Sequence, residues 1–218
     1  PVSMHFHFAS DKDLIVVSKP NVQLTTVPRM KTSLLMRVAY LGAQERDMFH
    51  SRAFKTIISQ VQTSRMQHTG AQFHQSLVFN LAVTSLNFCC RRKCQKEALN
   101  WFNWSGAHGQ EPLKHVELKF NGAVKFSEPA QVARLVEPYL AKCNIPTLYQ
   151  YSINFGLDPY SVTNQSQGFV NMSKLDNISL TLWVQDEIAN ESLEMVIFAT
   201  SLNVLSFKDG LAGLVYAS

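Results

Sequence analysis

Apolar and polar residues alternate along most of this sequence, and the alternation predicts a fold built of β-strands. In the stretch 149–157 every second residue is apolar or aromatic, and the residues between are polar or glycine. A period of two is typical of a strand with one buried face. The same pattern predicts strands at 2–8, 77–83, 116–120, 124–126, 178–184 and 193–205, and short apolar runs predict further strands at 14–17 and 34–41. Residues 54–61 also fit the apolar stripe of a helix, but their β-branched residues favour a strand.

The parity of the alternation changes at two places. Leu77 to Val83 follow one parity, and Leu86 and Phe88 follow the other, with Thr84-Ser85 between them. An extra residue in one strand of a pair, a β-bulge, produces such a change. The last predicted strand changes parity in the same way past Thr200-Ser201, so we expect a second bulge there.

The strongest local signal is a hairpin. Asn121-Gly122 separates the alternating runs 116–120 and 124–126. Both central residues of a type I′ turn need positive φ, which Asn and Gly tolerate best.

One substantial helix is expected after this hairpin. Ser127 can cap it, Pro129 suits its first turn, and an apolar stripe runs from Val132 to Leu140. Pro138 should kink the last turn. The polar stretch 43–50 can hold a further turn of helix.

The 218 residues can form one large β domain or two small ones. No linker, repeat or low-complexity segment divides them, and eight to ten strands with two-faced patterning must cover one another. We therefore expect a single all-β unit over residues 1–218, closed as a sandwich or a barrel.

Charge is low and balanced. Charged residues make up 17% of the chain and the net charge is +4, against about 25% charged residues in an average domain. This suggests that partner subunits cover some of the surface. The one basic run, Arg91 to Lys93 with Lys96, is interpreted as a solvated loop or a subunit rim, because no aromatic residues are interleaved with it as in nucleic-acid sites. No apolar run approaches the 18 residues of a transmembrane helix.

Two chemical sites can be drawn from the sequence as alternatives. His5 and His7 alternate onto one face, as the metal ligands of a cupin do, with Asp11 and Asp13 following. Trp101 and Trp104 lie in the expected loop 100–112, where they could stack on sugar rings in a carbohydrate-binding jelly roll or anchor a subunit interface.

The sequence contains no recognisable motif of a catalytic centre. Cys89, Cys90 and Cys94 lack a usual zinc spacing, and Cys143 is interpreted as a small core residue. There is no Gly-x-Ser-x-Gly elbow and no phosphate-binding loop. We expect no enzyme, no cofactor, and no catalytic or metal-binding residue.

Taken together, several motifs in the second half resemble a known family. Asn121-Gly122 ends a strand, Leu157-Asp158-Pro159 ends another, and Asn203-Val204-Leu205 lies in the last strand before the glycine-rich end 210–214. Between them stand Gly168, Asn171, Ser173 and Asp176. This series, within a resemblance that covers most of 46–218, is similar to the major capsid proteins of nucleocytoplasmic large DNA viruses. Lys174 departs from the arginine of the family pattern.

The resemblance implies a structural protein. Subunits of that family are double jelly rolls that trimerise into pseudo-hexagonal capsomers of an icosahedral shell. This chain would be the second, C-terminal jelly roll, an eight-stranded antiparallel sandwich with one short helix, and its start at Pro1 within a strand fits an excised segment. The resemblance also implies a homotrimer, contacts with neighbouring capsomers, minor capsid proteins and the penton, no direct nucleic-acid contact, and assembly in the host-cell cytoplasm. Asn171, Ser173 and Asp176 would be hydrogen-bonding residues of turns and sheet ends.

Overall fold

Two antiparallel sheets form the body of the protein in a computed structural model that describes residues 7, 33–98, 100–160, 168–209 and 211–216. The first sheet has the order β1 (Phe54–His68), β9 (Leu193–Lys208), β3 (Ala82–Arg92), β6 (Gln150–Asn154). The second has the order β2 (Gln72–Ser76), β8 (Ile178–Val184), β4 (Leu113–Phe120), β5 (Ala123–Pro129). Two short strands extend the first sheet: β7 (Val170–Asn171) pairs with β3, and β10 (Leu211–Leu214) with β9.

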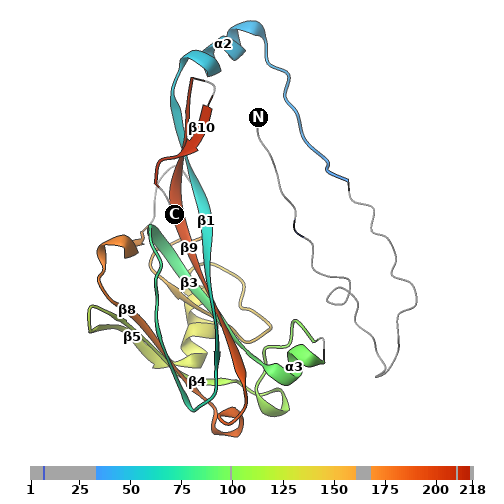
Figure 1. Cartoon of the computed structure of the whole chain (residues 1–218), viewed down its shortest axis with the longest axis vertical. Coiled ribbons are helices and arrows are strands. Elements are labelled where there is room, and N and C mark those ends of the chain that lie inside the picture. Colours follow the sequence, from blue (N-terminus) through green and yellow to red (C-terminus); the bar gives the residue numbers. More distant parts are fainter. Residues whose placement is uncertain (1–6, 8–32, 99, 161–167, 210, 217–218) are drawn as a thin grey trace.

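The pairing of the eight main strands is nested, as in a jelly roll. The first strand pairs with the last, β1 with β9, and the next pairs inward are β2 with β8, β3 with β6, and β4 with β5. The prediction of an eight-stranded antiparallel jelly-roll sandwich is therefore confirmed, with β7 and β10 as additions. Figure 1 shows β1 and β9 continuing past the sandwich as a two-stranded ribbon towards β10 and helix α2 (Ala43–Ser51).

The core lies between the two sheets. Inward-facing apolar side chains of both sheets are almost completely buried there, among them Phe73, Leu86, Phe88, Tyr151, Leu182 and Met195. The rings of Phe88 and Tyr151 stack with centroids 5.4 Å apart. Interdigitated side chains of two facing sheets are what hold a sandwich together.

Two local predictions are confirmed in detail. Asn121 and Gly122 both have positive φ, 50° and 80°, in the tight turn between β4 and β5. The register of β3 against β9 shifts between Val83 and Ser85, so Thr84 is the extra residue of a bulge. Its hydroxyl donates to the Pro159 carbonyl at 2.9 Å and so joins the bulge to the loop after β6.

The predicted second bulge, at Thr200-Ser201, is wrong. β9 pairs with β1 over fifteen residues without a shift, and Ser201 and Asn203 continue the inward-facing parity as buried polar residues. Asn203 Nδ2 donates to Gln60 Oε1 and to the Tyr216 carbonyl, both at 2.9 Å. The apolar pattern changes parity because polar side chains occupy the inner positions here, and their hydrogen bonds make that burial tolerable.

Three strand predictions also need correction. Residues 33–42 form no strand, and Leu35 and Tyr40 are 98% and 97% exposed, because no strand of the described structure lies beside them. Residues 77–81 alternate between buried and more exposed positions, with Val78 94% exposed, but form no strand, since the chain crosses between sheets and Leu81 has φ 69°. β6 ends at Asn154, which leaves Leu157 78% exposed in a turn.

The predicted helix starts later than expected. Ser127 and Pro129 belong to β5, and the Ser127 hydroxyl bonds His115 Nε2 at 3.0 Å instead of capping a helix. A π-helical turn, η2 (Val132–Val136), leads into α4 (Glu137–Leu140). Pro138 lacks an N–H, and the irregularity before it takes the form of this wide turn.

Helical content exceeds the one helix predicted. The turn expected at 43–50 is α2. The other short helices among the described residues are α3 (Lys93–Glu97), η1 (Ala107–Gly109), η3 (Met172–Lys174) and η4 (Asp186–Ile188). The strands predicted at 2–8 and 14–17 lie outside the described residues, apart from His7.

Candidate functional site

The basic run at the end of β3 is neutralised within the chain. Arg91 forms an ion pair with Glu194, whose side chain is 13% exposed, and Arg92 forms a two-point pair with Glu191 at 2.6 Å for each contact. Lys96 lies 3.5 Å from Glu194. The interpretation as a solvated loop is therefore wrong for the two arginines, since both lie on β3 and are held by Glu194 and Glu191, while the alternative of a subunit rim stays a prediction.

Trp101 and Trp104 pack on the same cluster. The Arg91 guanidinium lies 5.2 Å from the ring centroid of each tryptophan, and both residues are half-buried. A guanidinium on an indole face adds electrostatic attraction to the packing. The two tryptophans therefore fix the loop between α3 and β4, and only one of them, Trp104, also lines a pocket.

A second polar network fixes the π turn against the sheet. Arg134 donates to both carboxylate oxygens of Glu111, at 3.0 and 3.1 Å from its Nε. The buried Tyr151 hydroxyl donates to the same carboxylate at 2.6 Å, and burial raises the pKa of Tyr151 far above its ordinary value. This network joins the loop before β4, the helical turn and β6 into one rigid unit.

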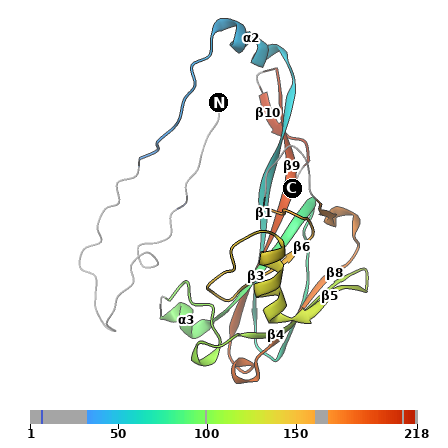
Figure 2. The ribbon, with the colours of Figure 1, turned by 180° about the vertical axis from the view of Figure 1, so that it is seen from behind.

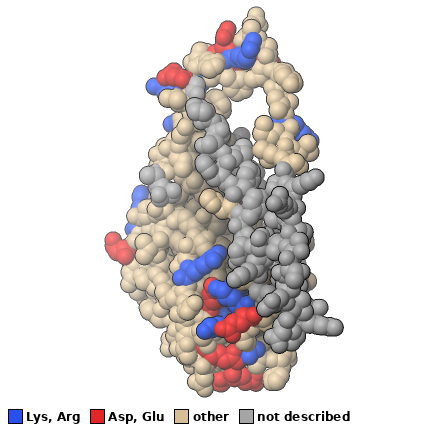
Figure 3. All heavy atoms as spheres, turned by 45° about the vertical axis from the view of Figure 1, so that its right-hand side comes forward, with Lys and Arg blue, Asp and Glu red and all other residues tan. Residues whose placement is uncertain are grey.

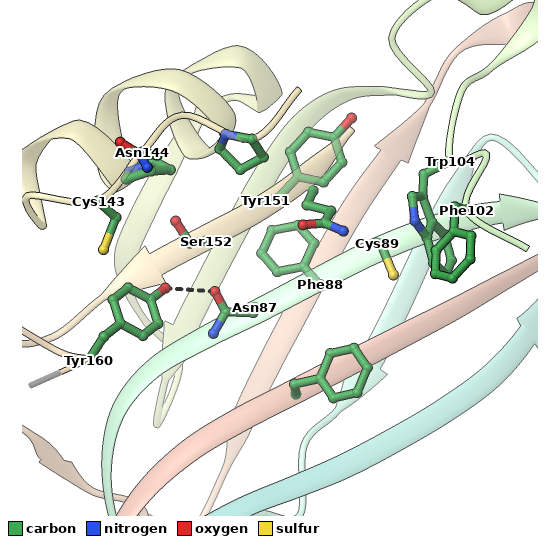
Figure 4. Close-up of a pocket in the computed structure, with 14 residues that line it drawn as sticks. Asn87, Phe88, Cys89, Phe102, Trp104, Cys143, Asn144, Tyr151, Ser152 and Tyr160 are labelled. Carbon is green, nitrogen blue, oxygen red and sulfur yellow. Dashed lines mark hydrogen bonds between the residues drawn. The ribbon is translucent and has the colours of Figure 1, made fainter. Parts of the chain in front are cut away.

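These two networks bound a pocket of about 490 Å³ on the outer face of the first sheet. Figure 4 shows Asn87 and Cys89 on β3 and Ser152 on β6, with Trp104 and Phe102 at one end and Tyr160, Cys143 and Asn144 at the other. The Tyr160 hydroxyl donates to Asn87 Oδ1 at 2.8 Å. Sequence reasoning identified Trp104 but missed Phe102, Asn144 and Tyr160, because isolated loop residues carry no periodic signal.

A separate feature is the apolar surface around the projecting ribbon. Large apolar side chains are exposed in the segment 33–42, on α2, at the start of β1 and at the C-terminal end. The most exposed are Leu35, Tyr40, Leu211, Met36, Leu34 and Val38, and Tyr216 and Phe49 are each about half exposed. Figure 2 shows α2 and β10 together at this end of the molecule. So many exposed apolar residues in one region mark an interaction surface.

Charged residues are sparse elsewhere on the surface. Figure 3 shows positive and negative side chains side by side near the lower end of the molecule, while much of the described surface on that face is uncharged.

The described residues do not test the cupin alternative, because they include His7 but not His5, Asp11 or Asp13. No group of three or more His, Cys, Asp or Glu side chains in the described structure could hold a metal ion. Burial raises the pKa of Cys89 and of Cys90 to about 12, and Cys143, interpreted as a core residue, is only half-buried at the pocket. None of the helices described is long and apolar enough to cross a membrane.

Comparison with known proteins gives the family. The model of the family described as large eukaryotic DNA virus major capsid protein matches residues 45–213, which is most of the chain. The chain belongs to this family. The major capsid protein of Chrysochromulina ericina virus is 29% identical over 113 residues, and that of Phaeocystis pouchetii virus is 28% identical over 113 residues. These alignments cover 50% of this chain, but only 19% and 21% of the two capsid proteins.

Solved structures show the same fold. The PBCV-1 virus capsid quasi-atomic model superposes with a TM-score of 0.69 at 20% identity, covering 82% of this chain and 55% of that one. The Faustovirus major capsid protein gives a TM-score of 0.64 at 14% identity, covering 76% and 36% of the two chains. This chain therefore spans about half or less of the capsid proteins that it matches.

The capsid motif residues hold the sheet ends together. Asn171 Oδ1 accepts from the Ser173 amide at 3.2 Å, and Ser173 Oγ accepts from the Leu81 amide at 2.8 Å. Gly168 has φ 123° and lies against the backbone of Gly156. The expected hydrogen-bonding roles of Asn171 and Ser173 are thus confirmed, and Asp176 lies exposed in the following turn.

Proposed function

We propose that this chain is the C-terminal jelly roll of a viral major capsid protein, and that residues 1–218 form a single domain of a double jelly-roll subunit. The observation that carries the proposal is the family match over 45–213 on a nested eight-stranded jelly roll. The partial coverage of the PBCV-1 capsid chain, 55%, supports a longer subunit of which this is one part.

The function is assembly by burial of apolar surface. Three subunits would form a pseudo-hexagonal capsomer, and the exposed apolar residues around α2 and the ribbon would be covered by the rest of the subunit and by neighbouring copies. Obligate interfaces bury on the order of 2,000–5,000 Å² and are rich in such residues. Capsomers would then tile an icosahedral shell together with minor capsid proteins and the penton, in a virion assembled in the host-cell cytoplasm.

We propose that this work needs no catalysis. The raised pKa values of Cys89 and Cys90 leave these thiols protonated and unreactive at neutral pH. The arginines that could contact nucleic acid are paired with Glu194 and Glu191 instead.

Sedimentation velocity of the chain at micromolar concentration tests the assembly. We expect a species of three times the 24.6 kDa chain mass. The double variant Leu35→Asp/Tyr40→Asp should shift it towards monomer, because a charge at a buried contact opposes association, whereas Leu157→Asp, at an exposed apolar residue on a different loop, should not. A wild-type chain that stays monomeric at this concentration would contradict trimerisation through this domain.

A further inference from the structure

The pocket on the outer face of the first sheet has the form of a binding site that capsid assembly does not explain. Its volume, about 490 Å³, falls within the range of roughly 300–1,000 Å³ typical of small-molecule sites. Phe198 of β9 and Cys89 of β3 line it, and Figure 4 shows Trp104 and Asn144 at opposite ends. It is therefore built from elements that the sandwich already holds in place.

Aromatic rings line the pocket, and two of them, Trp104 and Tyr160, are held by contacts within the chain. Phe102 is 77% exposed and Tyr160 is 41% exposed, so both present ring surface to solvent. Trp104 is held by the Arg91 guanidinium, 5.2 Å from its ring centroid, and Tyr160 by its 2.8 Å hydrogen bond to Asn87. A large exposed ring such as Phe102 at the mouth of a preformed pocket is a surface that a ligand can stack on.

The polar groups of the pocket are neutral. Asn144 and Gln150 are exposed residues that line it, and Figure 4 shows Ser152 between Asn144 and Asn87. None of the described residues that line the pocket is Lys, Arg, Asp or Glu. Each side-chain amide offers two N–H donors and a carbonyl acceptor, which matches a pair of adjacent hydroxyl groups, each of them both donor and acceptor.

We propose that this pocket binds a neutral oligosaccharide. The C–H groups on one face of a sugar ring carry partial positive charge and pack on the negative face of an aromatic ring such as Phe102. The ring hydroxyls then meet the amides of Asn144 and Gln150. An apolar peptide would leave these exposed amides without partners, and an anionic ligand would find no cation, so a neutral sugar is the chemistry that fits both sets of groups.

A glycan array of the 218-residue chain tests the proposal, with neutral, sialylated and sulfated oligosaccharides on the same surface. The neutral oligosaccharide that binds best is then titrated by calorimetry, and tryptophan fluorescence is followed because Trp104 lines the pocket. Phe102→Ala and Gln150→Ala should each lower the affinity about tenfold, the equivalent of one lost stacking or hydrogen-bonding contact. Both residues are exposed, so neither variant should disturb folding, and thermal unfolding checks this.

Tyr139→Ala and Gln110→Ala are matched controls, because they remove an exposed aromatic ring and an exposed amide outside the pocket. They should bind as the wild type does. Decaproline, an apolar neutral peptide, is titrated in parallel. The proposal is overturned if no neutral oligosaccharide binds, if sulfated or sialylated glycans bind in preference, if decaproline occupies the pocket instead, or if Phe102→Ala binds the sugar unchanged.

Discussion

Replacing Glu194 by Ala removes the carboxylate that neutralises Arg91. The side chains of this pair are only 9% and 13% exposed, and Arg91 is enclosed further by Trp101 and Trp104. The neighbouring pair of Arg92 with Glu191 has the same chemistry but side chains 22% and 33% exposed. The two pairs therefore form a comparison in which burial differs, and in which Glu194 has the additional neighbour Lys96 at 3.5 Å.

The expected loss of unfolding free energy in Glu194→Ala comes from the Arg91 charge that is left without a partner. Breaking a buried ion pair from one side costs about 3–5 kcal/mol, because the remaining charge stays desolvated. The Trp101 carbonyl, 3.5 Å from Arg91 Nη1, offsets part of this, so we expect about 3 kcal/mol for Glu194→Ala. For Glu191→Ala, where Arg92 can return to water, about 0.5–1 kcal/mol is expected.

Urea unfolding followed by circular dichroism measures both losses. With an m-value of about 2 kcal/mol/M, the midpoint should fall by about 1.5 M for Glu194→Ala and by less than about 0.5 M for Glu191→Ala. Equal shifts for the two variants would refute the reasoning that burial decides the value of these pairs. The double variant Arg91→Met/Glu194→Leu should recover much of the loss, since it leaves no unpaired charge.

The same pair predicts an acid dependence. Burial acts to raise the pKa of Glu194, but the hydrogen bonds and charge of Arg91 with the charge of Lys96 outweigh it, and the pKa lies below its ordinary value of 4.5. A lowered folded-state pKa contributes stability that is fully present above the ordinary pKa and is lost as the pH falls through the lower one. The stability difference between wild type and Glu194→Gln should therefore be constant near neutral pH and shrink below about pH 4.5.

Two further predictions concern backbone and thiols. Gly122→Ala should lower the free energy of unfolding by about 1–2 kcal/mol from positive φ alone, since an added Cβ meets nothing within 4 Å. Gly168→Ala should lower it by about 3 kcal/mol, because its Cβ would lie 2.9 Å from Gly156 Cα. Thermal unfolding ranks the two variants, and the reverse order would contradict the contact argument. Iodoacetamide at pH 8 should alkylate the exposed Cys94 but leave Cys89 and Cys90 unmodified until urea is added, because burial raises the pKa of each of these two thiols to about 12. Peptide mapping identifies the modified sites. Early modification of Cys89 or Cys90 in the folded chain would show that they are accessible.

The sequence predicted those elements whose signal is local. The Asn121-Gly122 turn requires positive φ at two successive residues, and the bulge at Thr84 changes the parity of the apolar pattern in the sequence. Strand bounds were less predictable where a segment has the alternating burial of a strand but does not pair with a neighbouring strand. Residues 77–81 alternate because Leu77, Phe79 and Leu81 are buried while Val78 is exposed, although their backbone joins no ladder.

The surface sites depended on contacts between distant residues. Glu194 lies 103 positions from Arg91, and Tyr160 lies 73 positions from Asn87. No periodic pattern relates such residues, so the basic run looked free and the pocket could not be foreseen. Trp104 was identified only because an exposed tryptophan is unusual in any loop.

The position of β9 between β1 and β3 has a consequence for synthesis on the ribosome. The strand that joins β1 to β3 in the first sheet, Leu193–Lys208, is made after β1, β3 and β6. Until it emerges, β1 has no neighbour in that sheet, and its fifteen-residue ladder closes a loop of well over a hundred residues. Such long-range closure is slow and leaves apolar strands open to wrong partners. The first sheet can therefore close only after β9 has been made, and nascent chains that stop before residue 193 should be substrates for chaperones.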